Sequence, residues 1–336
     1  MQSPYILLRR YAKFICVITL FLIALGALVK STESGLSVPD WPTTYGKFMF
    51  AYPLNKMAGG IKYEHTHRML ATIVGLLTLI LTIWLLRIKD MPVWIKRLGI
   101  FVFLIIVLQG VLGGLTVMLF LPVWLSTFHG VLAQTFFLIV ILIAYALSTE
   151  RRHRWTIEEE SYDPLFLKLA IFLMVMVYIQ LIIGNVMRHA QAGLAIPDFP
   201  TMGWTFFPTF DQAWLNRINA WRFENNLDPV NMGQVMIHLT HRFWAFLVLI
   251  DILWLNSIAY KRCLDRPLIL QTLYWLNIAV ILQITLGIST VLSHKEVYTT
   301  TVHVTMGAIV LALTFLMVLR STPLTWRQFK TLLTKK

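Results

Sequence analysis

Four histidines of this 336-residue chain form two pairs with the same spacing. His67 and His129 are 62 residues apart (129 − 67), and so are His241 and His303 (303 − 241). The second pair follows the first by 174 residues (241 − 67), and all four lie at the ends of long apolar stretches. Neutral imidazole is a good ligand for iron and a common axial ligand of haem. The spacing therefore predicts two copies of one unit, each holding iron between two imidazoles.

A single histidine at the end of a membrane helix is more often a hydrogen-bonding residue between helices than a metal ligand. The duplication changes this balance, because two matched pairs at similar depth favour ligation. We therefore predict that all four histidines of the pairs are metal ligands. The other histidines considered have no partner at the repeat spacing and are predicted to be loop or surface residues: His65, His153, His189 and His294.

The composition is that of an integral membrane protein. Hydrophobic residues make up 57% of the chain and charged residues 13%, and the mean hydropathy is +0.69. Soluble domains carry about 25% charged residues. The net charge of +13 comes from cations in short loops between apolar runs, so it indicates membrane topology rather than nucleic-acid binding.

Eight apolar runs approach the length of about 20 residues that a membrane-spanning helix needs. They predict an all-α fold with eight helices: Phe14–Val29, Met69–Leu86, Leu98–Leu121, Val123–Leu147, Leu165–Met187, His238–Ala259, Leu268–Leu292 and Thr299–Leu319. The two termini and alternate loops contain 19 Lys and Arg, and the remaining loops contain 8. Because the cation-rich side is cytoplasmic, both termini are predicted inside, and the two long loops and the histidines near the outer face.

The chain is also an internal repeat. Thr66-His67-Arg68 recurs as Thr240-His241-Arg242, and the loop Gly35–Pro42 recurs as Gly193–Pro200 with an offset of 158 rather than 174. The second loop must therefore hold 16 extra residues (174 − 158), expected around Asp211–Asp228. We predict two domains, 1–150 and 151–336, as four-helix bundles related by a pseudo-two-fold axis along the membrane normal.

Two arginines directly follow the first histidine of each pair. Arg68 and Arg242 are candidate cofactor-binding residues, because a guanidinium can bind a haem propionate through two hydrogen bonds. The alternative is that they lie at the headgroup level of the membrane. The repeated Gly113 and Gly287 could let a helix backbone approach the face of a macrocycle.

One acidic residue breaks the symmetry. Glu64 lies one helical turn outward from His67 on the same face, and its counterpart in the second half is His238. A carboxylate beside a haem edge could move protons, so Glu64 is a candidate catalytic residue. The alternative is a solvated acid or an acid at a helix N-terminus.

These motifs together resemble the haem A synthase family over essentially the whole chain. The resemblance rests on Glu64-x-x-His67-Arg68, His129, His241-Arg242, His303 and the outer-loop sequence Thr32-Glu33-Ser34-Gly35-Leu36-Ser37. It implies an oxidoreductase that converts the C8 methyl of haem O to a formyl group, which makes haem A for terminal oxidases. It also implies a resident haem b at His241 and His303. Substrate haem O would then bind at His67 and His129, where Glu64 is the acid implicated in activity.

The resemblance implies a bacterial cytoplasmic membrane and a haem O supply from a membrane haem O synthase. A homo-oligomer is compatible with the sequence, and the electron acceptor stays open. Many bacterial members carry a cysteine pair in the first outer loop, but residues 31–63 of this chain contain no cysteine. A mechanism that needs that pair cannot operate here, so we expect a cysteine-free subtype.

Two other functions fit parts of the same pattern. A dihaem b cytochrome that oxidises quinol would use the same four histidines, and a transporter could contain duplicated four-helix units. The oxidation route also stays open. If both His67 and His129 bind the substrate iron, no position is left for oxygen, so either one histidine dissociates or water attacks the methyl carbon. The symmetry of the two histidine pairs favours the route in which water attacks the methyl carbon.

Overall fold

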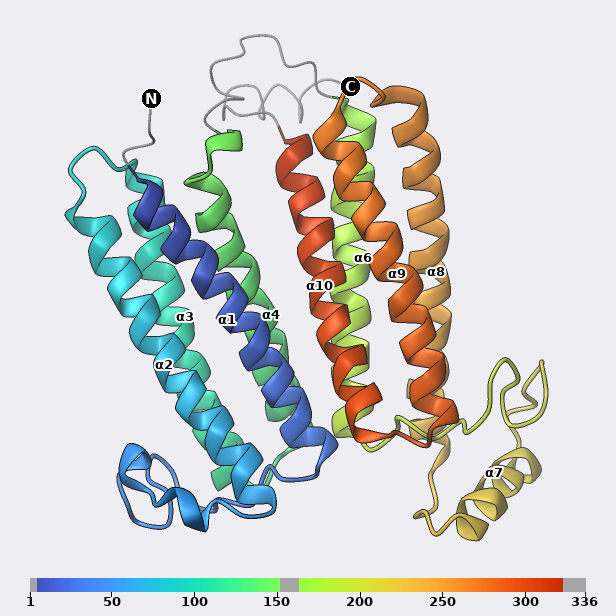
Figure 1. Cartoon of the computed structure of the whole chain (residues 1–336). Coiled ribbons are helices and arrows are strands. Elements are labelled where there is room, and N and C mark those ends of the chain that lie inside the picture. The colour runs from blue at the N-terminus through green and yellow to red at the C-terminus, as the bar shows by residue number, and fades with distance from the viewer. Residues whose placement is uncertain (1–4, 152–162, 323–336) are drawn as a thin grey trace.

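The computed structural model describes residues 5–151 and 163–322, which contain helices and loops but no β-strand. Eight of these helices are long and apolar enough to cross a membrane, which confirms the predicted all-α membrane fold (Figure 1). They are α1 (Ile6–Ser31), α2 (Gly60–Arg87), α3 (Val93–Met118), α4 (Val123–Ala146), α6 (Pro164–His189), α8 (Met232–Arg262), α9 (Pro267–Leu292) and α10 (Val297–Ser321).

The helix bounds follow the sequence repeat. Helices α1 and α6 both have 26 residues and start 158 residues apart (164 − 6), whereas α3 and α9 have 26 residues and start 174 apart (267 − 93). Prolines define several starts: Pro164 and Pro267 occupy first-turn positions, where the missing N–H costs no helical hydrogen bond.

Four helices start at least five residues earlier than their hydropathy predicted, including α1 at Ile6 rather than Phe14 and α3 at Val93 rather than Leu98. The two that bear on the site are α2 and α8. Helix α2 begins at Gly60 rather than Met69, and α8 begins at Met232 rather than His238. Their first turns are polar, which lowers the apolar signal. In α8 a capping box fixes the start, because Asn231 and Gln234 accept each other's backbone N–H. Consequently Glu64 and His67 lie within α2 and not before it.

The helices form two four-helix bundles, α1 to α4 and α6 with α8 to α10, each with its own apolar core (Figure 1). Between the bundles, α1 packs on α10 and α4 packs on both α6 and α10. Because α1 is equivalent to α6, and α4 to α10, exchanging the two bundles reproduces the same contacts. This is the pattern that an isologous two-fold interface gives, and it fits the predicted pseudo-two-fold relation.

The two long loops lie at one end of the bundles, and the start of α1 and the end of α10 lie at the other (Figure 1). The first loop contains two short 3₁₀ helices, Met49–Ala51 and Leu54–Lys56. The second contains α7 (Gln212–Glu224), which falls within the predicted insertion around Asp211–Asp228 and confirms it. Trp214 of α7 is 1% exposed and packs in a small core with Ile196 and Ile218.

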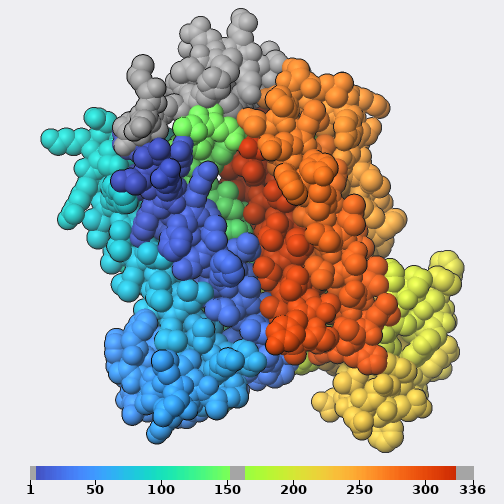
Figure 2. Space-filling view, in the orientation of Figure 1, coloured from blue at the N-terminus to red at the C-terminus, as the bar shows by residue number. Residues whose placement is uncertain are grey.

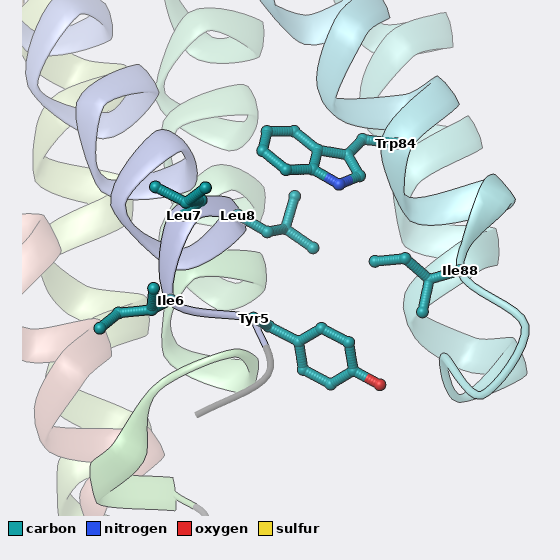
Figure 3. A pocket seen from close by; sticks show the side chains of 6 residues that line it. All are labelled: Tyr5, Ile6, Leu7, Leu8, Trp84 and Ile88. Atoms are coloured by element: carbon teal, nitrogen blue, oxygen red, sulfur yellow. The ribbon is translucent and has the colours of Figure 1, made fainter. Parts of the chain in front are cut away.

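A pocket of about 260 Å³ lies at the end of the first bundle that is opposite to the long loops (Figure 3). It is lined by the start of α1 and the end of α2, with Leu8, Trp84 and Ile88 among the side chains. No histidine or acidic residue lines it. The pocket is therefore separate from the candidate haem-binding residues.

Candidate functional site

Each of the four candidate ligands rests against a glycine on a neighbouring helix. A Cβ atom added to any of these glycines would lie 3.0–3.1 Å from Cε1 of the facing imidazole, closer than most real contacts. A side chain there would displace the ring, so glycine is what lets the ring lie against the helix. The four contacts are Gly26 with His67, Gly113 with His129, Gly184 with His241 and Gly287 with His303.

The histidines of each bundle come together as the sequence predicted. His67 of α2 and His129 of α4 are close enough to interact electrostatically, and so are His241 of α8 and His303 of α10. Across the residues that the structure describes, no group of three or more His, Cys, Asp or Glu could hold a metal ion. Each bundle therefore offers a pair of imidazoles and no larger ligand set.

Glutamine amides bond to two of the four histidines, and a third glutamine lies near His303. Gln109 Nε2 donates to the backbone carbonyl of His129 at 3.0 Å, and Gln180 Nε2 donates to that of His241 at 3.0 Å. Gln283 Nε2 lies against Gly307, one turn after His303. The residue equivalent to Gln180 in the first bundle is Leu22 (180 − 158), so His67 lacks this support.

Glu64 closes the first outer loop over its bundle. Its carboxylate is buried, accepts the backbone N–H of Val38 at 2.7 Å, and pairs with the Arg68 guanidinium. Arg68 in turn donates to the carbonyls of Val38 and Asp40, both at 2.6 Å. We call Glu64, Arg68 and the Val38–Asp40 backbone the first latch.

The second bundle contains an equivalent latch with different chemistry. His238 is also buried, and its Nδ1 accepts the N–H of Ile196 at 3.1 Å. Arg242 donates from Nε to His238 Nε2 at 3.2 Å, and its Nη2 donates to the carbonyls of Ile196 and Asp198. A neutral imidazole accepts at only one nitrogen, whereas a carboxylate accepts at both oxygens. The first latch can therefore satisfy both donors at once, but the second cannot.

Asp40 and Asp198 organise the turn that follows each latch. Asp40 accepts hydrogen bonds from the Thr43 hydroxyl at 2.5 Å and from the N–H groups of Tyr45 and Gly46 at 2.7 and 2.9 Å. Partial burial alone would raise the pKa of Asp40, but these hydrogen bonds outweigh it and hold the pKa below its usual value. Asp198 makes the same pattern of contacts with the Thr201 hydroxyl and two backbone N–H groups.

Comparison with known proteins identifies the family. The model of the cytochrome oxidase assembly protein family matches residues 9–315. The chain belongs to this family. Among its relatives, the heme A synthase of Pelagibacter ubique is 25% identical over 91% of this chain and 95% of the relative. The heme A synthase of Shewanella oneidensis is 28% identical over 83% of this chain and 86% of the relative. That of Rickettsia bellii is 24% identical over 88% of this chain and 93% of the relative.

The imidazole pairs fit a haem with two axial histidines. Nδ1 of His67, His129 and His303 is buried without a hydrogen-bond partner, while all four rings keep part of their surface accessible. Nε2 of His67 and of His303 is not among these buried atoms, whereas Nε2 of His129 and both ring nitrogens of His241 face glutamine amides. In His67 and His303 this pattern fits a ring that turns Nδ1 into the protein and Nε2 toward a metal.

The structure corrects one prediction about the remaining histidines. His65 is fully buried in α2, within 3.0 Å of the Thr44 hydroxyl and 5.3 Å from the Tyr52 ring, so its prediction as a loop or surface residue is wrong. The early start of α2 at Gly60 explains the error. His189 is half-buried at the end of α6, and His294 is exposed as predicted. His153 lies outside the described residues.

Sequence reasoning missed several residues of this site. It identified Gly113 and Gly287, but not Gly26, Gly184 or Gln180. The signal was present, because α1 and α6 repeat with the loop offset of 158, which pairs Gly26 with Gly184 (184 − 26).

The outer loop also reaches the first bundle directly. The Trp41 ring lies in close contact with the position where Gly114 of α3 would carry a Cβ, one residue from the glycine that contacts His129. The aromatic outer loop therefore packs into the outer end of the first bundle beside a candidate ligand.

Proposed function

We propose that the chain is a haem A synthase, a multi-pass membrane oxidoreductase that converts the C8 methyl of haem O to a formyl group. The observation that carries this proposal is the pair of glycine-backed histidines in each bundle of a chain from the cytochrome oxidase assembly family. The curated heme A synthases match over nearly the whole chain, which supports the same reaction here.

The two bundles take different haems in this proposal. His241 and His303 hold a resident haem b, and His67 and His129 hold haem O as substrate and haem A as product. The additional amide of Gln180 supports a permanent ligand at His241. The acid Glu64, which occurs only in the first latch, supports the placement of the reaction in the first bundle.

Glu64 is the proposed catalytic acid-base group. Its carboxylate is buried at the outer end of α2, one turn from His67, where a carboxylate can take up a proton from the reacting methyl group. Arg68 and Arg242 were predicted to bind propionates, and this stays a prediction. Their contacts with loop carbonyls support a role in holding the loops over the haem edges.

Formation of the aldehyde needs one oxygen atom and removes four electrons and four protons, since CH₃ plus H₂O gives CHO plus four hydrogens. A bound haem supplies redox chemistry, and the electrons must pass to an acceptor in the membrane. If both His67 and His129 held the substrate iron, they would leave it no position for oxygen. We therefore expect the formyl oxygen to come from water. Turnover in H₂¹⁸O should label haem A, and label arriving only from ¹⁸O₂ would contradict this route.

The alternative function is a dihaem b cytochrome that oxidises quinol, which the near-equivalence of the two imidazole pairs favours. Pigment extraction and mass analysis separate the two functions. Haem b together with haem O or haem A in the purified protein supports the synthase, whereas two haem b per chain supports the cytochrome. A protein that contains no haem would exclude both.

The proposed location is the bacterial cytoplasmic membrane, with both chain ends in the cytoplasm and both haem sites near the outer face. An even number of spanning helices places the ends of the chain on one side, and the histidines lie toward the opposite side, near the long loops. Haem O would then come from a haem O synthase in the same membrane. Protease digestion of oriented vesicles tests this, because only the outer loops should be cut from outside.

A further inference from the structure

A seam of polar contacts joins the two bundles at their outer ends. Arg188 of α6 donates to the carbonyl of Ala27 and to the hydroxyl of Ser31, the latter at 2.9 Å, both on α1. Thr301 of α10 donates to the same Ser31 hydroxyl at 3.2 Å. Figure 2 shows α1 and α10 side by side along this seam. The outer ends of α1, α6 and α10 therefore meet at one place.

The seam carries an excess of positive charge. Lys295 interacts electrostatically there with three other cations, Lys30, Arg188 and Arg222, and with one acid, Glu33. Glu33 pairs with Lys30 at 2.8 Å. Within the described part of the chain, neither Arg188 nor Lys295 forms an ion pair with an acidic side chain.

The pKa of Lys295 responds to the same excess of positive charge. Burial lowers the pKa of its ammonium group, and the nearby cations lower it further, although Glu33 acts in the opposite direction. Arg222 donates from two nitrogens, Nε and Nη1, to the carbonyls of Asp228 at 2.6 Å and Leu194 at 2.8 Å, whereas both donations of Arg188 come from Nη2 alone. Arg188 therefore has more donors left for a ligand than Arg222. An anion that reached Arg188 and Lys295 would relieve the repulsion.

These cations lie at the outer edge of the imidazole pairs. Arg188 is one helical turn outward from Gly184, the glycine that contacts His241, and on the same face of α6. Its charge is also close enough to act on His303. A haem between His241 and His303 carries two propionate carboxylates on one edge, and an edge that faces outward would meet Arg188 and Lys295.

The same positions in the first bundle carry no net charge. Lys30 is equivalent to Arg188 (188 − 30 = 158), but it is neutralised by Glu33, whose own equivalent is the uncharged Gln191 (191 − 33 = 158). Glu33 and Gln191 share a left-handed backbone, with φ of 50° and 56°. The two loop ends therefore have matching conformations and differ in the charge that they present.

The turn that contains Lys295 shows a second replacement of this kind. Lys295 is equivalent to Leu121 (295 − 121 = 174), and the two residues have φ values of 64° and 58°. The seam thus has two unneutralised cations on the side of the second bundle, and a neutral pair and a leucine on the side of the first.

We propose that Arg188 and Lys295 bind the propionate carboxylates of the haem held in the second bundle. The neutral Lys30–Glu33 pair gives the first bundle no equivalent anchor. One bundle thereby retains its haem while the other releases haem A after the reaction. The assignment rests on the proposed function, and it uses charge-assisted hydrogen bonds, which are the strong class in proteins.

Haem-loss rates test the anchor. Purified protein that contains haem b is mixed with excess apomyoglobin, and haem transfer is followed by absorbance. Lys295→Gln should increase the rate of haem b loss about tenfold, as expected for one charge-assisted hydrogen bond. Lys47→Gln, which removes an exposed lysine of the first outer loop, should leave the rate unchanged. Equal rates for Lys295→Gln and the unsubstituted protein would overturn the proposal.

A modified haem separates carboxylate binding from a general effect on folding. When apoprotein is loaded with haem b dimethyl ester, whose propionates carry no charge, Lys295→Gln should no longer change the loss rate. Faster loss of the ester in this variant would mean that Lys295 acts on the fold or binds a lipid phosphate, and the proposal would fail.

A substitution in the first bundle tests the other half of the proposal, that this bundle lacks an anchor for its haem. Glu33→Gln leaves Lys30 unpaired and should slow the release of haem A about tenfold, whereas unchanged release would contradict the proposed asymmetry. Failure of the proposed function looks different, because the purified protein would then contain no haem O or haem A at all.

Discussion

The two bundles share one scaffold, and the differences that bear on the candidate sites lie mostly toward their outer ends. The helix bounds of α1 and α3 recur in α6 and α9, and each imidazole in either bundle rests on a glycine. In contrast, Glu64 of the first bundle is equivalent to His238 of the second, and Leu22 of the first is equivalent to Gln180 of the second. The two bundles therefore present similar imidazole pairs, and in the proposed function these differences separate the site that retains haem b from the site that acts on haem O.

The largest expected effect comes from removing a ligand on one side only. His303→Ala should abolish the resident haem b, whereas His129→Ala should leave haem b in place and remove haem O and haem A. Loss of one of two axial imidazoles costs iron coordination in that bundle alone. Pyridine haemochrome spectra and mass analysis of extracted pigment measure both outcomes. Loss of haem b in His129→Ala would show that the bundles do not bind haem independently.

The next effect concerns the two latches. Glu64→Ala should stop formation of haem A while haem b is retained, because it removes the acid and leaves the buried Arg68 charge without its carboxylate partner. Breaking a buried ion pair in this way costs about 3 kcal/mol. The first outer loop should therefore open, which limited trypsin digestion at Lys47 and Lys56 would detect.

Two matched variants separate chemistry from loop closure. Glu64→Gln keeps an acceptor for the Val38 N–H but no charge, so the loop should stay largely closed while activity is lost. His238→Glu gives the second latch the chemistry of the first and should protect the second outer loop from protease. Normal haem A formation in Glu64→Ala would show that the acid has no catalytic role.

A smaller effect is expected from the glycine contacts. In Gly184→Ala the new Cβ would lie 3.1 Å from His241 Cε1 and push the ring from its position. An imidazole displaced from its preferred rotamer costs about 1 kcal/mol, so haem b affinity should fall about fivefold. Gly75→Ala is the control, because nothing lies within 4 Å of a Cβ there and alanine favours the helix. Equal haem affinities in the two variants would show that the contact has no role.

The helices and the imidazole pairs could be predicted because each leaves a regular pattern in the sequence. Apolar runs give helix number, and equal spacing gives the pairing of His67 with His129. The latches could not be predicted in the same way, since the hydrogen bond from Val38 to Glu64 joins a loop of irregular backbone to a helix. His65 was misplaced for the same reason, because polar residues bonded to a loop look exposed in a hydropathy profile.

The smallest expected effect concerns α7, which has no equivalent among the described helices of the first bundle. Asp211 caps α7 by accepting the N–H of Trp214 at 2.7 Å. This hydrogen bond, with a second one from Thr209, holds the pKa of Asp211 below its usual value.

Because the pKa of Asp211 is lower in the folded than in the unfolded protein, the cap stabilises α7 fully above the unfolded pKa of about 3.9. This stabilisation is lost as the pH falls through the folded pKa. Asp211→Ala should therefore accelerate amide exchange in the first turn of α7 at pH 7, and the difference from the unsubstituted protein should shrink below about pH 4. A difference that persists unchanged in acid would assign the effect to packing rather than to the charged cap.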